Sequence, residues 1–260
     1  MNESFDHLAP ECRDEARLGT AERIRAILTE RWINYPRAGL ALQRLEHLLH
    51  HPARDRMPCL LLFGPTGMGK TKILRKFIRD HPALFNSKTG INGMPLVAMQ
   101  MPPDPDEKAF YLQLLSALNA PTRYSHTVYQ LRQIVAELLA FTQTRMIIID
   151  RALLTDQQLA DRFEAAELQP WRNDADFKRL LASFQALLPL RKRSDLSTAD
   201  IRQEIIRRTE GITVRIVRLL EHLAIHSIHS GLEAITLECF VVLDSQAPLL
   251  SMETHARSIE

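Results

Sequence analysis

The stretch Gly64-Pro65-Thr66-Gly67-Met68-Gly69-Lys70-Thr71 fits the pattern G-x-x-x-x-G-K-[ST], a glycine-rich loop that wraps the phosphates of a nucleotide. Before it, the apolar run Cys59-Leu60-Leu61-Leu62-Phe63 predicts a buried parallel strand. After it, residues 70–80 predict a helix with its apolar residues on one face. Strand, loop and helix follow in the order that a phosphate loop requires, so we interpret the stretch as a nucleotide-binding site. The alternative is a glycine-rich turn that only joins a strand to a helix.

The residue types of the loop suit phosphate chemistry. Glycines let the backbone bend so that successive N–H groups point at an anion, and the start of the helix adds its positive dipole end. We expect Lys70 to reach the β- and γ-phosphates and the Thr71 hydroxyl to hold Mg²⁺. The motif therefore predicts these cofactor-binding residues: Gly64, Pro65, Thr66, Gly67, Met68, Gly69, Lys70 and Thr71.

A second metal-binding candidate, Asp150, ends the apolar run Met146-Ile147-Ile148-Ile149. A carboxylate at this strand end suits Mg²⁺, which prefers oxygen ligands and keeps several waters. Alone the pattern is weak, because many strands end in Asp as a turn residue. Its distance behind a phosphate loop favours the metal-binding interpretation.

Strand and helix patterns alternate through the middle of the chain, and residues 96–101 predict another strand. This alternation indicates an α/β fold with a parallel sheet flanked by helices. Residues 86–95 predict a loop, and the polar residues 1–19 predict a mobile arm. Beyond Trp171 the pattern is all helical, with a capping box expected at residues 197–200. We therefore expect an N-terminal arm and helices (1–56), a P-loop core (57–171), and a helical lid and tail (172–260).

The bulk properties narrow the class of protein. The chain has 260 residues, of which 45% are hydrophobic, and no apolar run approaches the roughly 18–20 residues of a membrane span. The first residues lack a secretory pattern, and the three separated cysteines have no metal or redox spacing. We expect a cytoplasmic protein without membrane contact. A net charge of +2 neither favours nor excludes nucleic acid.

Five segments carry a resemblance to a known family: residues 30–37 (ERWINYPR), 62–71 (LFGPTGMGKT), 159–164 (LADRFE), 168–171 (LQPW) and 210–215 (EGITVR). With its phosphate loop, Asp150 strand and helical lid, the chain resembles the AAA+ ATPases. Within them it resembles the TniB/TnsC regulators of DNA transposition, TniB most of all. The resemblance implies ATP and Mg²⁺ as cofactors and an ATP-dependent homo-oligomer. Its implied partners are double-stranded DNA bound without sequence preference, a transposase and a TniQ-type target-site protein.

The resemblance also implies roles for four further residues. Tyr35 and Arg37 lie in the segment that contacts the adenine in related ATPases, although a proline-stopped helix junction explains them equally well. Arg162 resembles the arginine that reaches a neighbouring subunit's γ-phosphate; the alternative is an ion pair at a strand start. Arg215 stands where the lid carries its sensor arginine, or on a solvated helix face.

After Asp150 the chain departs from the family. A complete AAA+ core continues with a water-orienting Glu and a helix-strand-helix segment, whereas here Arg151 follows and Arg162 comes after eleven intervening residues. That interval holds one helix (152–160) before a strand (163–168), so a helix-plus-strand unit of roughly 30–40 residues is missing. Either the chain carries a deletion, which we favour, or the protein contains residues outside this sequence. A shortened sheet could close if the Asp150 strand lay directly beside the Cys59 strand.

Hydrolysis needs a group that positions water, and Arg151 cannot act as a base because it does not deprotonate. We therefore expect ATP binding with weak or no turnover. The leading hypothesis is an AAA+ regulator that assembles on DNA and recruits or activates a transposase. The alternatives are a non-hydrolysing adaptor that binds ATP, DNA or the transposase, and an AAA+ loader of a helicase or clamp.

Overall fold

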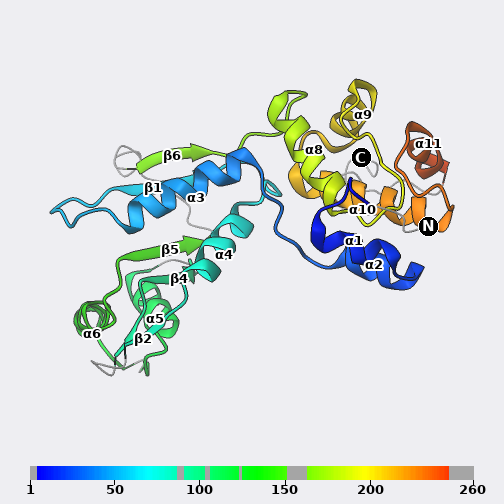
Figure 1. Ribbon diagram of the computed structural model, residues 1–260. Helices are drawn as coiled ribbons and strands as arrows, with labels where there is room; N and C mark the ends of the chain where they lie inside the picture. Colours follow the sequence, from blue (N-terminus) through cyan, green and yellow to red (C-terminus); the bar gives the residue numbers. More distant parts are fainter. Residues whose placement is uncertain (1–4, 87–90, 103–105, 123–124, 151–162, 246–260) are drawn as a thin grey trace. The chain divides into compact units, whose positions relative to one another are not determined.

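The computed structural model describes residues 5–86, 91–102, 106–122, 125–150 and 163–245. Contacts divide the chain into two units (Figure 1). The sheet unit comprises residues 38–64 and 69–168, and the helical unit comprises residues 1–37, 65–68 and 169–260. Of the phosphate loop, Pro65–Met68 belong to the helical unit, and Gly64 and the residues from Gly69 onward belong to the sheet unit.

The sheet unit contains two pairs of parallel strands. β1 (Cys59–Phe63) pairs with β6 (Phe163–Glu167), and β4 (Leu96–Gln100) pairs with β5 (Met146–Asp150). The parallel strands predicted from the alternating pattern are confirmed, and the β5 bounds match the apolar run that ends at Asp150. β1 is only half-buried along its middle, so the prediction of a fully buried strand is wrong for it.

The closure of β5 against β1, which the sequence left possible for a shortened sheet, is not seen in the part of the chain that the structure describes. Within the described ranges, β1 pairs with β6 and β5 pairs with β4, and the two pairs are not joined by a ladder. Different helices contact the two pairs. β4 shares a hydrophobic core with α5 (Glu107–Ala117) and α6 (Val128–Phe141). Arg44 of α3 (Pro36–Leu49) donates from Nη1 to the Ala165 carbonyl of β6 (3.4 Å). The place of the missing strand is thus not taken over by a shift of β5.

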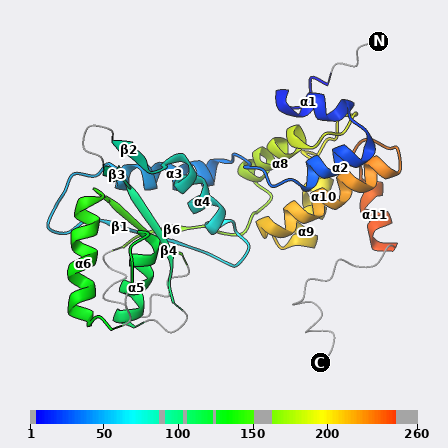
Figure 2. The same ribbon diagram turned by 90° about the horizontal axis from the view of Figure 1, so that it is seen from below.

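Helices cover the strands of the sheet unit. α5 (Glu107–Ala117) and α6 (Val128–Phe141) lie beside β4 (Figure 2). The buried residues of the core that they form with this strand are Val97, Met99, Leu114, Leu115, Leu118, Leu131 and Val135. α3 spans Pro36–Leu49, and α4 (Lys70–Asp80) has the predicted bounds. The predicted loop at 86–95 is wrong in part, because β2 (Leu84–Asn86) and β3 (Ile91–Gly93) form an antiparallel hairpin. Strands this short leave little periodicity in a sequence.

The helical unit is built around α10 (Thr213–His229). α2 (Thr20–Leu28), α9 (Ala199–Thr209) and α11 (Leu237–Ser245) contact it, and α8 (Ala175–Leu187) completes the unit. The apolar face of α10 is buried, at Ile216, Leu219, Leu220, Leu223, Ala224 and Ile228. The capping box expected at the start of α9 is wrong, because Thr198 makes no side-chain cap and its hydroxyl donates to the Asp195 carbonyl (3.2 Å) instead.

Residues 5–17 do not form the mobile arm that was predicted for residues 1–19. α1 (Pro10–Arg17) buries Cys12 and Ala16, and the preceding Phe5 and Leu8 are also buried. The Ala9 N–H donates to the Ala186 carbonyl at the end of α8 (2.8 Å). The apolar stripe of α1 consists of small residues in a polar stretch, so hydrophobic periodicity does not reveal it.

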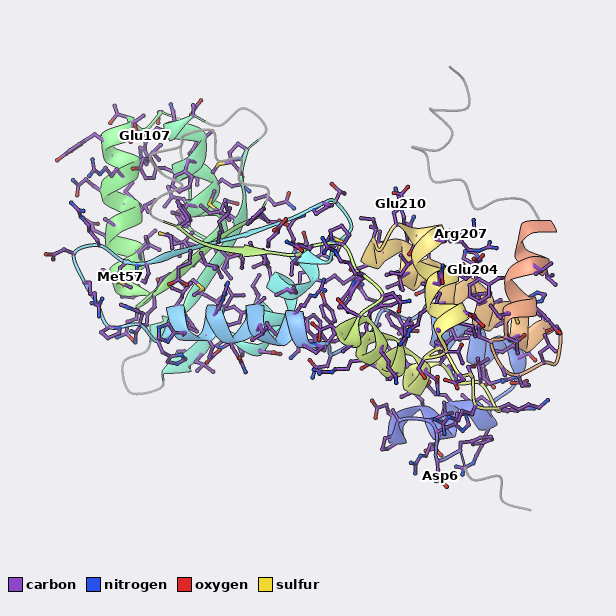
Figure 3. The ribbon with its side chains drawn as sticks, turned by 90° about the horizontal axis from the view of Figure 1, so that it is seen from above. Asp6, Met57, Glu107, Glu204, Arg207 and Glu210 are labelled. Atoms are coloured by element: carbon purple, nitrogen blue, oxygen red, sulfur yellow. The ribbon has the colours of Figure 1, made fainter. Side chains whose placement is uncertain are left out.

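Acid is expected to destabilise the helical unit. Glu204 and Arg207 both lie on α9 (Figure 3). The hydrogen bond from Arg207 lowers the pKa of Glu204 to about 2; burial opposes this shift, and Arg208 adds to it. Burial opposes the ionised form of Glu233, but Arg23 and the Arg191 N–H outweigh it, so the pKa of Glu233 is also lowered. Each carboxylate therefore stabilises the fold above its unfolded pKa of about 4.3. The contribution of Glu204 is lost as pH falls toward 2, and that of Glu233 is also lost as pH falls below the unfolded pKa.

Tryptophan fluorescence measures this effect, because both tryptophans of the chain, Trp32 and Trp171, belong to the helical unit. We expect the urea midpoint to fall steadily between pH 5 and about pH 2.5. Glu204→Gln is expected to flatten part of that fall, and added salt to weaken the Glu204 contribution, since this side chain is partly exposed. A midpoint independent of pH over this range would contradict the assignment.

Candidate nucleotide-binding site

The phosphate loop has the backbone that its glycines predict. Gly64, Gly67 and Gly69 have φ angles of 140°, 83° and 92°, which side-chain-bearing residues rarely adopt. A Cβ on Gly64 would lie 2.4 Å from the Leu168 carbonyl oxygen, and a Cβ on Gly67 would lie 2.6 Å from Val214 Cγ1. Both the backbone angle and the lack of space for a Cβ therefore favour glycine at Gly64 and Gly67.

Two predicted ligands of Mg²⁺ meet in the sheet unit. The Thr71 hydroxyl, in the first turn of α4, donates to Asp150 Oδ2 at the end of β5 (3.1 Å). Lys70 Nζ donates to the Gly64 carbonyl (2.6 Å), so the lysine lies within the loop. A hydroxyl beside a carboxylate forms the hard oxygen pair that Mg²⁺ takes together with phosphate and water. The residues present thus fit a nucleotide with its metal ion.

The middle of the loop joins three family segments in the helical unit. The Val214 N–H, in the first turn of α10, donates to the Gly67 carbonyl (3.0 Å). Trp171 Nε1 donates to Thr213 Oγ1 (2.9 Å), and the Trp171 N–H donates to the Gly211 carbonyl (2.9 Å). Residues 65–68, 168–171 and 210–215 are far apart in sequence, yet hydrogen bonds connect them within one unit.

Tyr35 and Arg37 are engaged with the Trp171 segment. The Tyr35 ring meets the Trp171 ring edge-on (5.3 Å between centroids), and burial raises the pKa of Tyr35 to about 12. The Arg37 guanidinium lies 4.4 Å from the Trp171 ring, donates to the Gln169 carbonyl (3.0 Å) and pairs with Asp174 (3.3 Å). These contacts favour packing at the start of α3 for both residues, and their role against adenine stays a prediction.

Of the two other arginines predicted for the site, the structure describes Arg215 but not Arg162. Arg215 Nη1 pairs with Glu210 Oε2 (2.6 Å), so its side chain has an acidic neighbour in the same segment of the lid. Arg162 lies outside the described residues, as do Arg151 and the predicted helix at 152–160. The sensor role of Arg215 and the γ-phosphate role of Arg162 stay predictions.

A pocket of about 340 Å³ in the sheet unit adds a residue that the motifs missed. Thr71 and Asp150 line it together with Gln100, the last residue of β4. Gln100 lies opposite Asp150 in the β4–β5 register. The sequence does show that Gln100 is a polar residue at the end of a predicted strand. It does not show that this strand pairs with β5, and only that pairing places Gln100 next to Asp150.

The described residues contain no group of three or more His, Cys, Asp and Glu side chains suited to a metal ion. Mg²⁺ bound with a nucleotide usually takes its other ligands from phosphate and water. Among the described helices, none has both the length and the apolar character to cross a membrane.

The chain has a phosphate loop between a parallel strand and a helix, and most of its helical unit follows the strands in sequence. This is the arrangement of the AAA+ class of P-loop proteins. A chain in the structure of Drosophila ORC bound to DNA aligns over 98% of this chain and 72% of its own length, with a TM-score of 0.53 and 13% identity. The Cdc6p crystal structure from Pyrobaculum aerophilum aligns over 80% of this chain and 67% of its own length, with a TM-score of 0.46 and 14% identity.

The chain belongs to the TniB family, because the bacterial TniB protein family matches residues 23–152, half of the sequence. The predicted resemblance to TniB is confirmed. The match includes the phosphate loop and Asp150 and ends two residues later, at the point where the sequence departs from a complete core. No curated protein matches the chain.

Proposed function

We propose that the protein is an ATP-binding AAA+ regulator of DNA transposition, which assembles on DNA and recruits or activates a transposase. The observation that carries the ATP-binding part is the contact between Thr71 and Asp150 beside an open glycine loop. Membership in the TniB family supports the link to transposition. The homo-oligomer, the transposase and the TniQ-type protein are part of the proposal.

Binding would use groups already in position. The loop N–H groups and Lys70 bind phosphate oxygens, and Lys70 exchanges its bond to the Gly64 carbonyl for them. Thr71 and Asp150 hold the metal ion, which supplies positive charge against the phosphates when bound. A switch in which ATP holds the oligomer is part of the proposal.

DNA contact is proposed to be electrostatic and independent of sequence. α4 exposes Lys72, Arg75 and Arg79, a basic set directly behind the phosphate loop. Phosphate contacts release counterions, so affinity falls steeply with salt and depends little on base sequence. The exposed basic residues of α4 support this mode of binding, although most such residues on any helix are simply solvated.

ATP-dependent assembly on DNA tests the proposal. We expect the protein to bind two unrelated duplexes equally, as larger complexes with ATP and Mg²⁺ than with ADP, and to lose this binding between about 50 and 200 mM salt. The assembled complex, and not the ADP form, should retain the purified transposase of the same element. Complexes of equal size with ATP, ADP and no nucleotide would contradict the switch.

A second candidate is an adaptor that binds ATP without turning it over. The sequence favours it because Arg151, which cannot act as a base, follows Asp150. Such an adaptor would assemble with ATP and would not disassemble through turnover, so the complex would keep its size over time in a fixed amount of ATP. Steady ATP hydrolysis that Lys70→Ala abolishes would rule the adaptor out.

A further inference from the structure

Gln100 lies beside the predicted metal ligands through the register of two strands. β4 and β5 are parallel, and Gln100 is paired with Asp150 at their last position. Side chains at paired positions of neighbouring strands lie on the same face, with strands about 4.8 Å apart. Gln100, Asp150 and Thr71 all line the pocket of about 340 Å³. The exposed carboxamide of Gln100 and the two predicted metal ligands therefore line the same pocket.

We propose that Gln100 positions the attacking water for ATP hydrolysis, an inference that rests on the proposed nucleotide site. A carboxamide presents both an acceptor and a donor, so its oxygen can accept from the water while its N–H₂ donates to a γ-phosphate oxygen. Glutamine orients the attacking water in other P-loop NTPases. Arg151, the residue at the position of the usual glutamate, has donors only and cannot do this.

The step balances without a protein base. The water oxygen bonds to the γ-phosphorus as the bond from that phosphorus to the bridging oxygen of ADP breaks, and the electron pair leaves with ADP. Gln100 cannot accept a proton, so the water's proton passes to a γ-phosphate oxygen. A residue that orients water without removing its proton accelerates hydrolysis less than a carboxylate base, which agrees with the weak turnover expected from the sequence.

The other polar residues of the pocket are less suited. Asp150 accepts the Thr71 hydroxyl and is assigned to the metal ion. Arg75 is permanently charged and donates only. Gln113 and Ser116 line the pocket from α5, so neither has the strand-end register that sets Gln100 opposite Asp150. Gln113 carries the same carboxamide in the same pocket and is therefore the matched control.

Single-turnover hydrolysis and ATP affinity, measured together on the full chain, test the proposal. We expect Gln100→Leu to lower the hydrolysis rate roughly 10- to 100-fold while the Kd of a fluorescent ATP analogue stays within about twofold. Gln113→Leu should leave both quantities within about twofold. Gln100→Glu should retain hydrolysis and make its rate rise with pH as the new carboxylate ionises, a change that a merely structural role would not produce.

Three results would overturn the assignment while ATP binding persists: no hydrolysis by the unaltered chain, unchanged hydrolysis in Gln100→Leu, or a Kd that weakens as much as the rate. Absence of ATP binding by the unaltered chain would instead overturn the proposed function, and Gln100 with it. The Kd of the ATP analogue therefore tells a failure of the Gln100 assignment from a failure of the proposed function.

Discussion

Replacing Lys70 by alanine is expected to weaken ATP binding by roughly 10- to 100-fold, the effect of losing a charged hydrogen-bond donor to phosphate. Lys70 Nζ lies 2.6 Å from the Gly64 carbonyl, so the ammonium is already within the loop that would hold the phosphates. The substitution leaves a carbonyl without this donor, which costs far less than an unpaired buried charge. Titration with a fluorescent ATP analogue, with and without Mg²⁺, measures the loss.

Lys72→Ala is the control for Lys70→Ala, because it removes a lysine two residues along the same helix from an exposed position. We expect its ATP affinity to stay within about twofold of the unaltered chain. Tryptophan fluorescence and circular dichroism should be unchanged in both variants. Equal weakening by the two substitutions would mean that general positive charge, and not a phosphate loop, attracts the nucleotide.

The second large effect concerns stability. Arg23→Ala is expected to lower the free energy of unfolding of the helical unit by about 3–5 kcal/mol. Arg23 is 2% exposed, and its two terminal nitrogens lie 2.6 and 2.7 Å from the two carboxylate oxygens of Glu233. Nη1 also donates to the Pro189 carbonyl (3.3 Å). Removing the guanidinium leaves the half-buried carboxylate of Glu233 without its main partner, so the loss exceeds that of one surface ion pair.

Urea unfolding followed by tryptophan fluorescence measures this loss, and Arg25→Ala on the exposed face of α2 provides the control, with a change within about 0.5 kcal/mol. Arg23→Met combined with Glu233→Met should recover much of the stability, because it removes both charges rather than one. If Arg23→Ala costs no more than Arg25→Ala, the pair does not hold α2 to the segment after α10.

Local patterns predicted the elements with strong signals. Lys70–Asp80 and Met146–Asp150 have the predicted bounds, because each combines clear periodicity or an apolar run with a defined end. The contact of Thr71 with Asp150 also follows from the sequence, since the motif and the strand end both belong at the carboxyl edge of a parallel sheet.

What the sequence could not predict depends on partners far along the chain. The ion pair of Arg23 with Glu233 joins α2 to the segment after α10, and no local pattern marks either residue. The place of Gln100 depends on the register of β4 against β5. In the residues that the structure describes, β5 pairs with β4 and not with β1, and local periodicity does not determine which strands pair.

The separate strand pairs have a consequence for handling the protein. Across the residues the structure describes, β1 and β5 each have a ladder on one edge only, and they carry the exposed apolar side chains Phe63 and Ile147. Open apolar strand edges are templates for aggregation. Preparations will thus contain two kinds of particle: nucleotide-governed complexes, and clumps that grow with concentration and warming whatever nucleotide is added. Light scattering at several temperatures, with ATP and with ADP, separates the two populations.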